Sequence, residues 1–543
     1  MIMLREKSVL SVKSDKKAWE LPCETQSLCP VCLKVIDAEL YEEDGQVLMR
    51  KSCGQDGNFR ELISSDAEFF LKMRRTHYDR PSGVANPNSA NQSHCPDECG
   101  LYEQHLSTPA MVNIDLTNRC NQNCPICFAS SNATGRVCEL SLEQVQRMLQ
   151  TARSIKPHPP SCLQYVGGEP TIYPNFLEAV RLAKPLGFAQ IQAASNGVRF
   201  AESPEFAEAV EEAGLDLVYL QFDGLSDRIY KKMRGRALLE TKMRAIENLG
   251  KAGIRVMLVP TIVKGTNDDN LGEILRFAIE HADVIAGISW QPVAITGRID
   301  ESKRREMRFT LADLARCLQE QTGIIDMHRD WYPFSIVAPF VRLMEIVNGQ
   351  PQLRLSCHPH CGCVTYLVID RESGQATPLP AIIDIEPAME MVDRIAARIE
   401  RHRWLKNISV LQAMKSLRKY FHQDHAPKGW GFEHFLEFVR YFTEFDQVTA
   451  GGKDYISQLR SSRYRLLLLA AMHFQDAYNY EVERSRRCVI LYSAPNGRLY
   501  PFCTWNSGPC HRYGVERQFA RPIAQVAEHR RRLHPTEEAV QKG

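Results

Sequence analysis

Three cysteines lie close together in one short segment of this 543-residue chain. Cys120, Cys124 and Cys127 fall within residues 115–129 in a CxxxCxxC pattern. Three thiolates in one loop can hold three irons of a cubane cluster and leave the fourth iron open. A structural zinc site closes four ligands around its metal, and this triplet has no obvious fourth member. The spacing therefore predicts a 4Fe–4S cluster with one position reserved for a small molecule. The alternatives are that the three cysteines are unrelated or that they form part of a zinc knuckle.

Glycine and polar residues follow the triplet at intervals that match the ends of later strands. Gly167 and Gly168 would let backbone atoms approach a ligand closely, and Glu169 can pair with an ammonium group. Two alternatives stay open, because Gly-Gly can simply form a turn and Asn196 can be a left-handed turn residue. The candidate small-molecule ligands at these strand ends are Gly167, Gly168, Glu169, Pro170, Ser195, Asn196, Gln221, Asp223, Thr261 and Gln291.

Two arginines follow the fourth of these segments. Arg234 and Arg236 offer planar guanidinium forks that suit a carboxylate, although arginines are more commonly surface residues. Just upstream, Gln221 and Asp223 point to one face by strand periodicity, so both can address the same site. The segment predicts a polar wall on one side of a ligand, with Arg234 as a candidate cofactor-binding residue.

Short β-branched runs alternate with helical patterns in the middle of the chain. Strands are expected near 111–117, 162–167, 189–195, 217–222, 255–262 and 284–292, and helices near 141–154, 175–186, 204–213, 237–252 and 269–281. Ser141 with Gln144 forms a capping box, and Ser203 before Pro204 is a helix start signal. This alternation predicts an α/β fold, a partial (βα)6 barrel of the TIM type with its functional groups at the C-terminal strand ends.

The regions on either side of the barrel carry further cysteines. A CPxC knuckle with another cysteine about twenty residues on predicts a small ribbon that needs iron or zinc to fold. Downstream, helices are expected near 309–320, 334–348, 385–401, 408–421, 432–444 and 455–474, and Asn496-Gly497 predicts a final β-hairpin. The domains are thus 1–110, Cys-rich and metal-binding; 111–295, the barrel; and 296–543, mainly helical. The candidate metal ligands are Cys29, Cys32, Cys53, Cys95, Cys99, Cys357, Cys361, Cys363 and Cys503.

Composition narrows the class of protein. The net charge of +2 gives no argument for a nucleic-acid partner, and no run of eighteen apolar residues exists to span a bilayer. The apolar run 466–472 is expected to be a buried helix face, with a membrane-surface element as the alternative. Eighteen cysteines without an apolar signal core favour a reducing cytoplasm, where thiolates can bind metals. Cys138, Cys162 and Cys317 lie in helix or strand patterns and are expected to be buried and unreactive.

The cysteine loop followed by Gly-Gly-Glu-Pro resembles the radical S-adenosylmethionine (SAM) superfamily. The resemblance implies that SAM chelates the open iron and is reductively cleaved to methionine and a 5′-deoxyadenosyl radical. It implies that residues 167–170 face the methionyl amine, that Ser195 and Asn196 face the ribose and carboxylate, and that Arg234 or Arg236 holds the carboxylate. Thr261, Val263 and Gln291 would border an adenine slot. An electron donor such as ferredoxin or flavodoxin is implied as a partner.

The flanking cysteines resemble one branch of that superfamily, which contains archaeal tetraether lipid synthases and pterin (dihydro-hydroxymethylpterin) methyltransferases. This branch implies auxiliary 4Fe–4S clusters and a mononuclear, rubredoxin-like iron. The chain departs from the pattern, because Asp56 stands where a histidine is common and Tyr102 where a third cysteine is common. Additional cysteines that could compensate are Cys23, Cys357, Cys363 and Cys510.

Three functions follow as hypotheses. The first is radical carbon–carbon bond formation on lipid chains, with the 466–472 face approaching an acyl tunnel and the enzyme cytoplasmic or in peripheral contact with a membrane. The second is radical methylation of a pterin-like small molecule, with SAM as both radical source and methyl donor. The third is a cluster-bearing scaffold or peptide-modifying protein whose ribbon binds a partner. A long apolar tunnel would favour the first, a short polar pocket the second, and an open barrel mouth the third.

Overall fold

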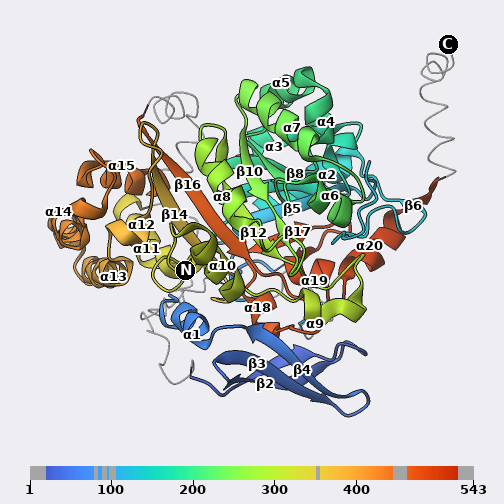
Figure 1. Cartoon of the computed structure of the whole chain (residues 1–543), viewed down its shortest axis with the longest axis horizontal. Helices are drawn as coiled ribbons and strands as arrows, with labels where there is room; N and C mark the ends of the chain where they lie inside the picture. The colour runs from blue at the N-terminus through green and yellow to red at the C-terminus, as the bar shows by residue number, and fades with distance from the viewer. Residues whose placement is uncertain are drawn as a thin grey trace, which may run out of the picture.

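One curved sheet forms the centre of the molecule in the computed structural model (Figure 1). The structure describes residues 20–78, 83–87, 95–96, 105–349, 355–443 and 462–523. Cys99 and Tyr102, about which the sequence made predictions, lie outside the described residues, as does the first part of the helix expected over 455–474.

Six parallel strands build the barrel portion of this sheet. They run in the order β5 (Met111–Thr117), β7 (Cys162–Gly167), β8 (Gln190–Ser195), β9 (Leu217–Gln221), β10 (Arg255–Val259) and β12 (Ile285–Pro292). The helices between them are α2 (Leu142–Arg153), α3 (Phe176–Ala183), α5 (Pro204–Ala213), α7 (Leu239–Lys251) and α8 (Leu271–Glu280), with the short α4 (Val198–Glu202) and α6 (Asp227–Arg234). The partial (βα)6 barrel is therefore confirmed.

Local signals set several of these boundaries. Ser141 and Gln144 form the expected reciprocal capping box at the start of α2, and the Ser203 hydroxyl accepts from the Phe206 amide to begin α5. The strand expected over 255–262 is interrupted at Pro260, so that β10 is followed by the short β11 (Thr261–Ile262). Proline has no N–H to donate to a ladder, which explains the break.

Strands from the C-terminal region extend the barrel sheet at both edges. Beside β12 lies β16 (Tyr464–Met472), which is parallel to it, and then β14 (Gly362–Asp370), antiparallel to β16 and paired with the short β13 (Tyr332–Pro333) and β15 (Ala376–Pro378). Beside β5 lies β17 (Ile490–Ser493), parallel to it, which forms the expected hairpin with β18 (Leu499–Pro501).

The prediction of a helix over 455–474 is wrong for residues 464–472. This segment is strand β16, hydrogen-bonded on both sides to β12 and β14. A short, continuous apolar run has the same pattern in a buried strand and in a buried helix, so periodicity could not separate them. Its β-sheet pairing also means that this segment is not a membrane-surface helix.

The other helices expected in the C-terminal region are confirmed. They are α10 (Leu311–Thr322), α11 (Ala338–Asn348), α13 (Ile385–Arg401), α14 (Lys406–Leu417) and α15 (Phe432–Thr443). In Figure 1, α11 to α15 gather beside β14 at one end of the molecule, around a separate hydrophobic cluster that includes Ile395, Ala413 and Trp430. Among the described residues, no helix is long and apolar enough to cross a membrane.

The N-terminal ribbon is a four-stranded antiparallel sheet with one helix. It consists of β1 (Cys23–Leu28), β2 (Val35–Glu43), β3 (Gln46–Cys53), β4 (Gly57–Ser64) and α1 (Ala67–Arg75). Its own core is small, with Leu40, Met49 and Phe70 at its centre. The ribbon lies below the barrel in Figure 1, next to the short helix α18 (Val482–Arg486). A core of this size is consistent with the expected dependence on a metal.

Candidate active site and metal centres

The loop with the cysteine triplet begins where β5 ends, at the C-terminal edge of the barrel sheet. Two side chains from different parts of the chain hold backbone carbonyls of this loop. Asn132 donates to the carbonyls of Cys120 and Gln122 at 3.0 and 3.2 Å. Arg298, which follows β12, donates to the carbonyl of Cys124 at 2.8 Å. Sequence reasoning missed both residues, because neither belongs to a recognisable motif.

Glycines allow the loop to lie directly on the neighbouring strand end. A Cβ on Gly167 would stand 2.2 Å from the carbonyl oxygen of Thr117, and one on Gly168 would stand 2.1 Å from that of Arg119. The Gly168 amide donates to the Thr117 carbonyl at 2.8 Å. The Gly-Gly pair is therefore required by close packing against the cysteine loop, which is more than an ordinary turn would need.

Glu169 joins two strand ends from a fully buried position. Its carboxylate accepts from the Ser195 hydroxyl at 2.8 Å, from the Asn196 amide at 2.7 Å and from Thr171. Burial raises the pKa of this carboxyl, and the hydrogen bonds oppose that rise. Glu169 thus joins the end of β7 to the loop after β8.

Asn196 projects from that loop towards the triplet. Its side-chain amide donates to Asn121 at 2.6 Å and lies 3.8 Å from the sulfur of Cys120. The left-handed turn residue is the next one, Gly197, with φ of 81°. The structure therefore places Asn196 at the edge of the cysteine loop, where a ligand of the open iron would lie.

Arg234 forms a buried ion pair with Asp223. The guanidinium donates to both carboxylate oxygens at 2.6 and 2.7 Å, to the Ile126 carbonyl at 2.9 Å and to the Thr261 hydroxyl at 3.2 Å. Four of its five N–H groups are thus engaged, one of them with the cysteine loop. Arg236 is exposed. Arg234 therefore ties the cysteine loop to Asp223 and Thr261.

Lys242 of α7 is a further site residue that the sequence did not reveal. Its buried ammonium donates to the Asn196 carbonyl and, at 2.8 Å, to the Gln221 side chain. Gln221 in turn donates to Asp223. Burial lowers the pKa of Lys242 to about 7. A lysine within a helical pattern normally reads as a solvated residue, so no sequence signal marked it.

The last two expected residues lie on adjacent strands. Thr261 pairs with Gln291 across β11 and β12, and the Thr261 amide donates to Asp223 at 3.2 Å. The predicted residues of all six strand ends therefore share one edge of the sheet. They are tied into one network around the cysteine loop.

The triplet is suited to a cluster. Burial raises the pKa of Cys120 to about 12, with the nearby Glu169 as the next cause, and burial also raises the pKa of Cys124. Thiols held in this way ionise when a metal replaces their protons. Three cysteines in a loop fixed at its carbonyls, beside a polar strand edge, can hold three irons and leave the fourth facing a ligand.

A second group of metal ligands lies in the ribbon. The ligand atoms of Cys29, Cys32, Cys53 and Asp56 are all within 4.8 Å of one another. An oxygen of Asp56 lies 3.1 Å from the sulfur of Cys29 and 3.2 Å from that of Cys53. Hydrogen bonds from these thiols, that of Cys32 first, lower the pKa of Asp56. With Asp56 as the fourth member, this group can hold zinc or iron in a tetrahedral site.

Replacing Asp56 tests this ligand set. Because losing an outer-shell partner already costs about 10–100-fold in metal affinity, Asp56→Ala is expected to weaken zinc binding by more than that. Asp56→His keeps four ligands and is expected to retain the metal. Competition with a chromophoric chelator measures both, and Glu42→Ala, at an exposed position of β2, is the matched control. Unchanged affinity in Asp56→Ala would remove aspartate from the site.

A third group of cysteines lies between the barrel and the C-terminal strands. Burial, and then the charges of Cys361 and Cys488, raise the pKa of Cys357. Burial raises the pKa of Cys503 to about 11, while the neighbouring Arg484 lowers it. We call Cys357, Cys361, Cys488 and Cys503, grouped around the buried Arg484, the four-cysteine pocket. A guanidinium among thiols favours thiolates, and four of them can hold an iron–sulfur cluster.

The structure places two other cysteines in relation to this pocket. Cys363 lies within β14, opposite Ala471, and is buried in the main hydrophobic core rather than in the pocket. Cys488, which was not among the expected ligands, lies near Cys361 and Cys503. Cys95 packs against the small cluster of Leu28 and Tyr480, as Cys503 does.

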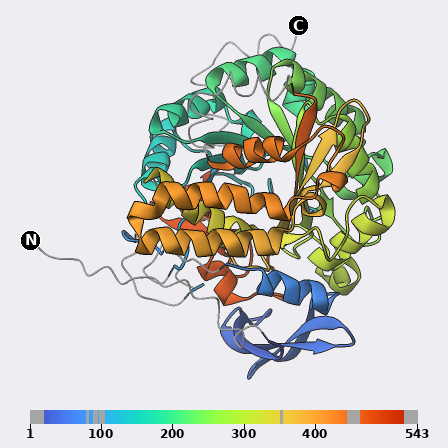
Figure 2. The same ribbon diagram turned by 90° about the vertical axis from the view of Figure 1, so that its left-hand side faces the viewer.

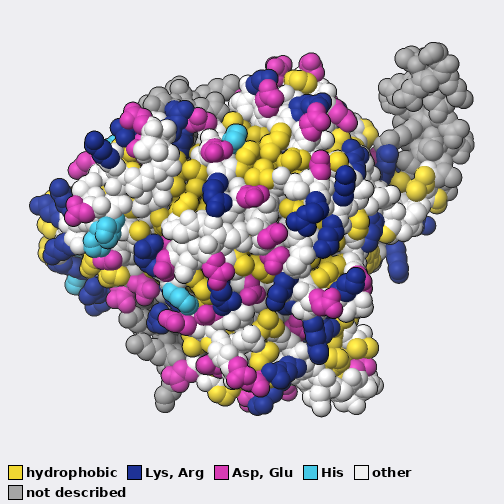
Figure 3. Space-filling model, in the orientation of Figure 1, with side chains coloured by type: hydrophobic (Ala, Val, Ile, Leu, Met, Phe, Trp, Pro, Cys, Tyr) yellow, Lys and Arg dark blue, Asp and Glu magenta, His cyan; other side chains and the backbone are white. Residues whose placement is uncertain are grey.

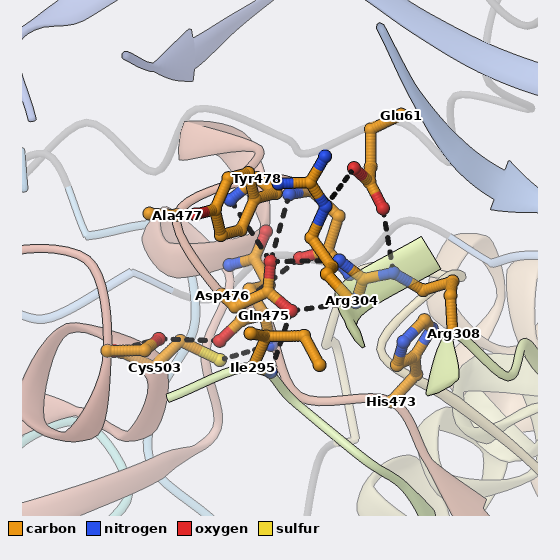
Figure 4. A network of polar contacts seen from close by, with 12 residues as sticks. Glu61, Ile295, Arg304, Arg308, His473, Gln475, Asp476, Ala477, Tyr478 and Cys503 are labelled. Carbon is orange, nitrogen blue, oxygen red and sulfur yellow. Dashed lines mark hydrogen bonds and ion pairs between the residues drawn. The ribbon is translucent and has the colours of Figure 1, made fainter. Parts of the chain in front are cut away.

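A buried network connects the ribbon to this pocket (Figure 4). Arg308 donates to Glu61 of β4 at 2.8 Å and to Asp476 at 2.7 Å, and all three side chains are buried. Lys51 of β3 donates to carbonyls of the same segment, including that of Tyr478 at 2.8 Å. One residue before Asp476, the Gln475 amide lies 3.5 Å from the sulfur of Cys503. The ribbon therefore braces a wall of the four-cysteine pocket.

Parts of the chain are similar to known protein families and structures. The model of the radical SAM superfamily matches residues 114–278, and that of the HMPTM N-terminal zinc ribbon domain matches residues 21–65. The chain is 28% identical over 185 residues to the probable GTP 3′,8-cyclase of Thermococcus kodakarensis, covering 34% of this chain and 58% of that protein. The structure of Streptococcus suis SuiB bound to S-adenosylmethionine aligns with a TM-score of 0.33 and 15% identity, over 52% of this chain and 68% of that one.

One similarity extends over nearly the whole chain. The 7,8-dihydro-6-hydroxymethylpterin dimethyltransferase of Methanocaldococcus jannaschii is 38% identical over 512 residues, which cover 94% of this chain and 97% of that protein. This range includes the barrel and most of both flanking regions. The chain is therefore a radical SAM enzyme, and it belongs to the family of the Methanocaldococcus jannaschii 7,8-dihydro-6-hydroxymethylpterin dimethyltransferase.

Proposed function

We propose that this enzyme methylates a pterin-like heterocycle, and that the methyl group comes from SAM. The observation that carries the proposal is the near full-length identity to a protein named as a pterin dimethyltransferase. A radical SAM enzyme binds a 4Fe–4S cluster and SAM, and one electron from a reductant such as ferredoxin or flavodoxin would cleave SAM to methionine and a 5′-deoxyadenosyl radical. We place the enzyme in a reducing cytoplasm, because its thiols must be free to bind metal.

In this proposal the strand edge orients SAM on the cluster held by Cys120, Cys124 and Cys127. Backbone atoms of Gly167 and Gly168 border the methionyl amine, because no side chain shields them. Asn196, held by Glu169 and Lys242, faces the carboxylate and ribose. The remaining N–H of Arg234 adds positive charge, and Thr261 and Gln291 border the adenine. The network keeps these groups fixed while water is excluded.

The other two metal groups have distinct proposed roles. The four-cysteine pocket would hold an auxiliary 4Fe–4S cluster, with Arg484 balancing its negative charge and the Gln475 amide directed at one sulfur. The ribbon site with Asp56 would hold zinc or a single iron and keep the ribbon folded against Glu61 and Arg308.

Incubating the anaerobically reconstituted enzyme with SAM, a reductant and dihydro-hydroxymethylpterin tests the activity. The expected result is 5′-deoxyadenosine together with a pterin heavier by one or two methyl groups, as seen by mass spectrometry. SAM carrying a deuterated methyl group should pass its label to the pterin. Formation of 5′-deoxyadenosine with the pterin unchanged would reject the substrate while leaving the radical chemistry intact.

Carbon–carbon bond formation on lipid chains is the second candidate. The observation that favours it is an exposed apolar face on α14, formed by Ile408, Leu411 and Met414 with Trp404 beside them. A parallel incubation with a lipid extract separates the two candidates. Loss of hydrogens from a lipid pair as they are joined, with the pterin unchanged, would select the lipid reaction.

A further inference from the structure

An exposed apolar stripe lies on the outer side of helix α14 and of the 3-10 turn 403–405 just before it. Trp404, Ile408, Leu411 and Met414 are 80%, 63%, 56% and 43% exposed. The three-residue spacing of Ile408, Leu411 and Met414 places them on one face of α14, and Trp404 lies in the turn that leads into the helix. We call these four residues the α14 stripe. Single exposed apolar residues are common on proteins, but four in a row that include a tryptophan mark a contact surface.

The opposite face of α14 is already used inside the protein. Ser409, Ala413 and Leu417 are buried, and α14 lies alongside α13. Figure 2 shows these two long helices side by side across the face turned to the viewer. One face of α14 therefore packs against the rest of the protein, and the stripe lies on a different face that points outward.

The sequence around the stripe is strongly cationic. Residues 401–423 contain six lysines and arginines and no aspartate or glutamate; these six are Arg401, Arg403, Lys406, Lys415, Arg418 and Lys419. All except Lys406 are exposed. In Figure 3, dark blue side chains crowd the left edge of the molecule, where α14 lies in Figure 1. This end of the molecule is therefore an apolar stripe with a basic rim.

The two carboxylates in the second half of the adjacent helix α13 are paired with an arginine of α11. On the adjacent α13, Asp393 and Glu400 both pair with Arg342, whose guanidinium donates to Asp393 at 3.1 Å. Arg398 of the same helix donates to Gln412 of α14 and keeps its charge. The rim thus stays positive next to the stripe.

The positive charge of the rim distinguishes between the molecules that could bind the α14 stripe. A second copy of the chain, docked through the same face, would bring two basic rims together, and like charges oppose this arrangement. A bilayer with anionic headgroups can bind both the apolar stripe and the basic rim. Apolar side chains enter the boundary between headgroups and acyl chains, and cations contact the lipid phosphates. Tryptophan favours that boundary, with its ring in the apolar layer and its N–H in the wet one.

We propose that α14 docks this enzyme on an anionic membrane surface. The α14 stripe enters the boundary between headgroups and acyl chains, while Arg403, Lys415, Arg418 and Lys419 contact lipid phosphates. The inference does not depend on the substrate, because docking is measured without SAM or pterin. Its failure would therefore leave the proposed methylation standing, and the reverse also holds.

Cosedimentation with vesicles tests the docking. The full-length holoenzyme is expected to bind equimolar phosphatidylcholine and phosphatidylglycerol vesicles and to leave them as salt is raised. Ile408→Ser combined with Leu411→Ser is expected to lower the partition coefficient at least about tenfold. Lys415→Glu combined with Lys419→Glu is expected to lower it by a similar factor or more on these vesicles. Arg147→Glu with Lys251→Glu, at exposed positions of α2 and α7, is the control.

Tryptophan fluorescence gives a second readout. Four of the six tryptophans, Trp290, Trp331, Trp430 and Trp505, are almost fully buried. Lipids brominated near the headgroup should therefore quench Trp404, and Trp404→Phe should remove that quenching. Unchanged circular dichroism in each variant shows that the fold is kept.

Two results would overturn the proposal. One is equal vesicle binding by the wild type and the Ile408→Ser, Leu411→Ser variant. The other is a dimer in sedimentation equilibrium that this variant dissolves while vesicle binding is absent, which would assign the stripe to a second copy of the chain.

Discussion

Alanine at Cys120, Cys124 and Cys127 together is expected to abolish reductive cleavage of SAM and to remove about four irons per chain. The loop is fixed by Asn132 and Arg298, so the protein should stay folded while losing its cluster. Formation of 5′-deoxyadenosine after reduction measures the first effect, and iron and sulfide analysis measures the second. Retained cleavage would show that these cysteines do not hold the catalytic cluster.

A complementary variant assigns the remaining iron. Replacing the four-cysteine pocket, Cys357, Cys361, Cys488 and Cys503, by alanine is expected to remove a second set of about four irons. The triplet cluster should survive and still cleave SAM. Cys317→Ala, in helix α10, is the matched control and should change neither value. Iron that does not fall in the four-cysteine variant would reject the auxiliary cluster alone.

Asp476→Asn is expected to lower the free energy of unfolding by about 3–5 kcal/mol, because it leaves the Arg308 guanidinium buried beside a neutral group. Arg308 is 2% exposed and Asp476 is 0% exposed, so water cannot replace the lost charge. Because Glu61 remains as an ion-pair partner of Arg308, we expect a loss of stability at the lower end of that range. Chemical denaturation of the reconstituted enzyme measures it.

The same variant has a predicted pH dependence. Burial, the largest single cause, would raise the pKa of Asp476, but the charge and hydrogen bond of Arg308 and the hydrogen bond from the Ile295 amide together outweigh it, and the pKa is lowered below the ordinary 3.8. A lowered carboxyl pKa contributes stability above the unfolded-state pKa and loses it as pH falls through the folded-state pKa. The difference in the free energy of unfolding between wild type and variant should therefore be largest at neutral pH and become smaller below about pH 3.8.

An exposed pair provides the control for this measurement. Glu240 and Arg244 pair on the surface of α7, with side chains 85% and 54% exposed. Glu240→Gln is expected to change the free energy of unfolding by about 0.5 kcal/mol or less. An equally small effect of Asp476→Asn would mean that the buried network does not brace the ribbon.

The barrel and its cysteine loop could be predicted from sequence because their signals are local. Ser141 caps α2 through a residue three positions away, and β5, β7 and β8 are each followed directly by an asparagine or a glycine. The Gly-Gly pair at 167 and 168 is also a local signal. Glycine is favoured where another backbone segment approaches closely or where the backbone adopts a conformation that other residues avoid. These features need no knowledge of what lies across the sheet.

Long-range features could not be predicted in the same way. Residues 464–472 are a strand because β12 and β14 lie on either side, and nothing within the segment distinguishes that from a helix. Cys488 rather than Cys363 joins the pocket because β14 turns Cys363 into the main core. Lys242 reaches the barrel edge from a helix whose pattern alone suggested a solvated lysine. In each case the deciding neighbour is far away in sequence.

The two flanking strands β16 and β17 also determine when the protein can fold. Until residues 464–493 leave the ribosome, β12 and β5 have open edges, although the six barrel strands have long been synthesised. Exposed sheet edges recruit other chains, so the nascent barrel is vulnerable to aggregation over this interval. The same delay keeps the cysteine loop, which follows β5, beside an open sheet edge until the last strands close the sheet.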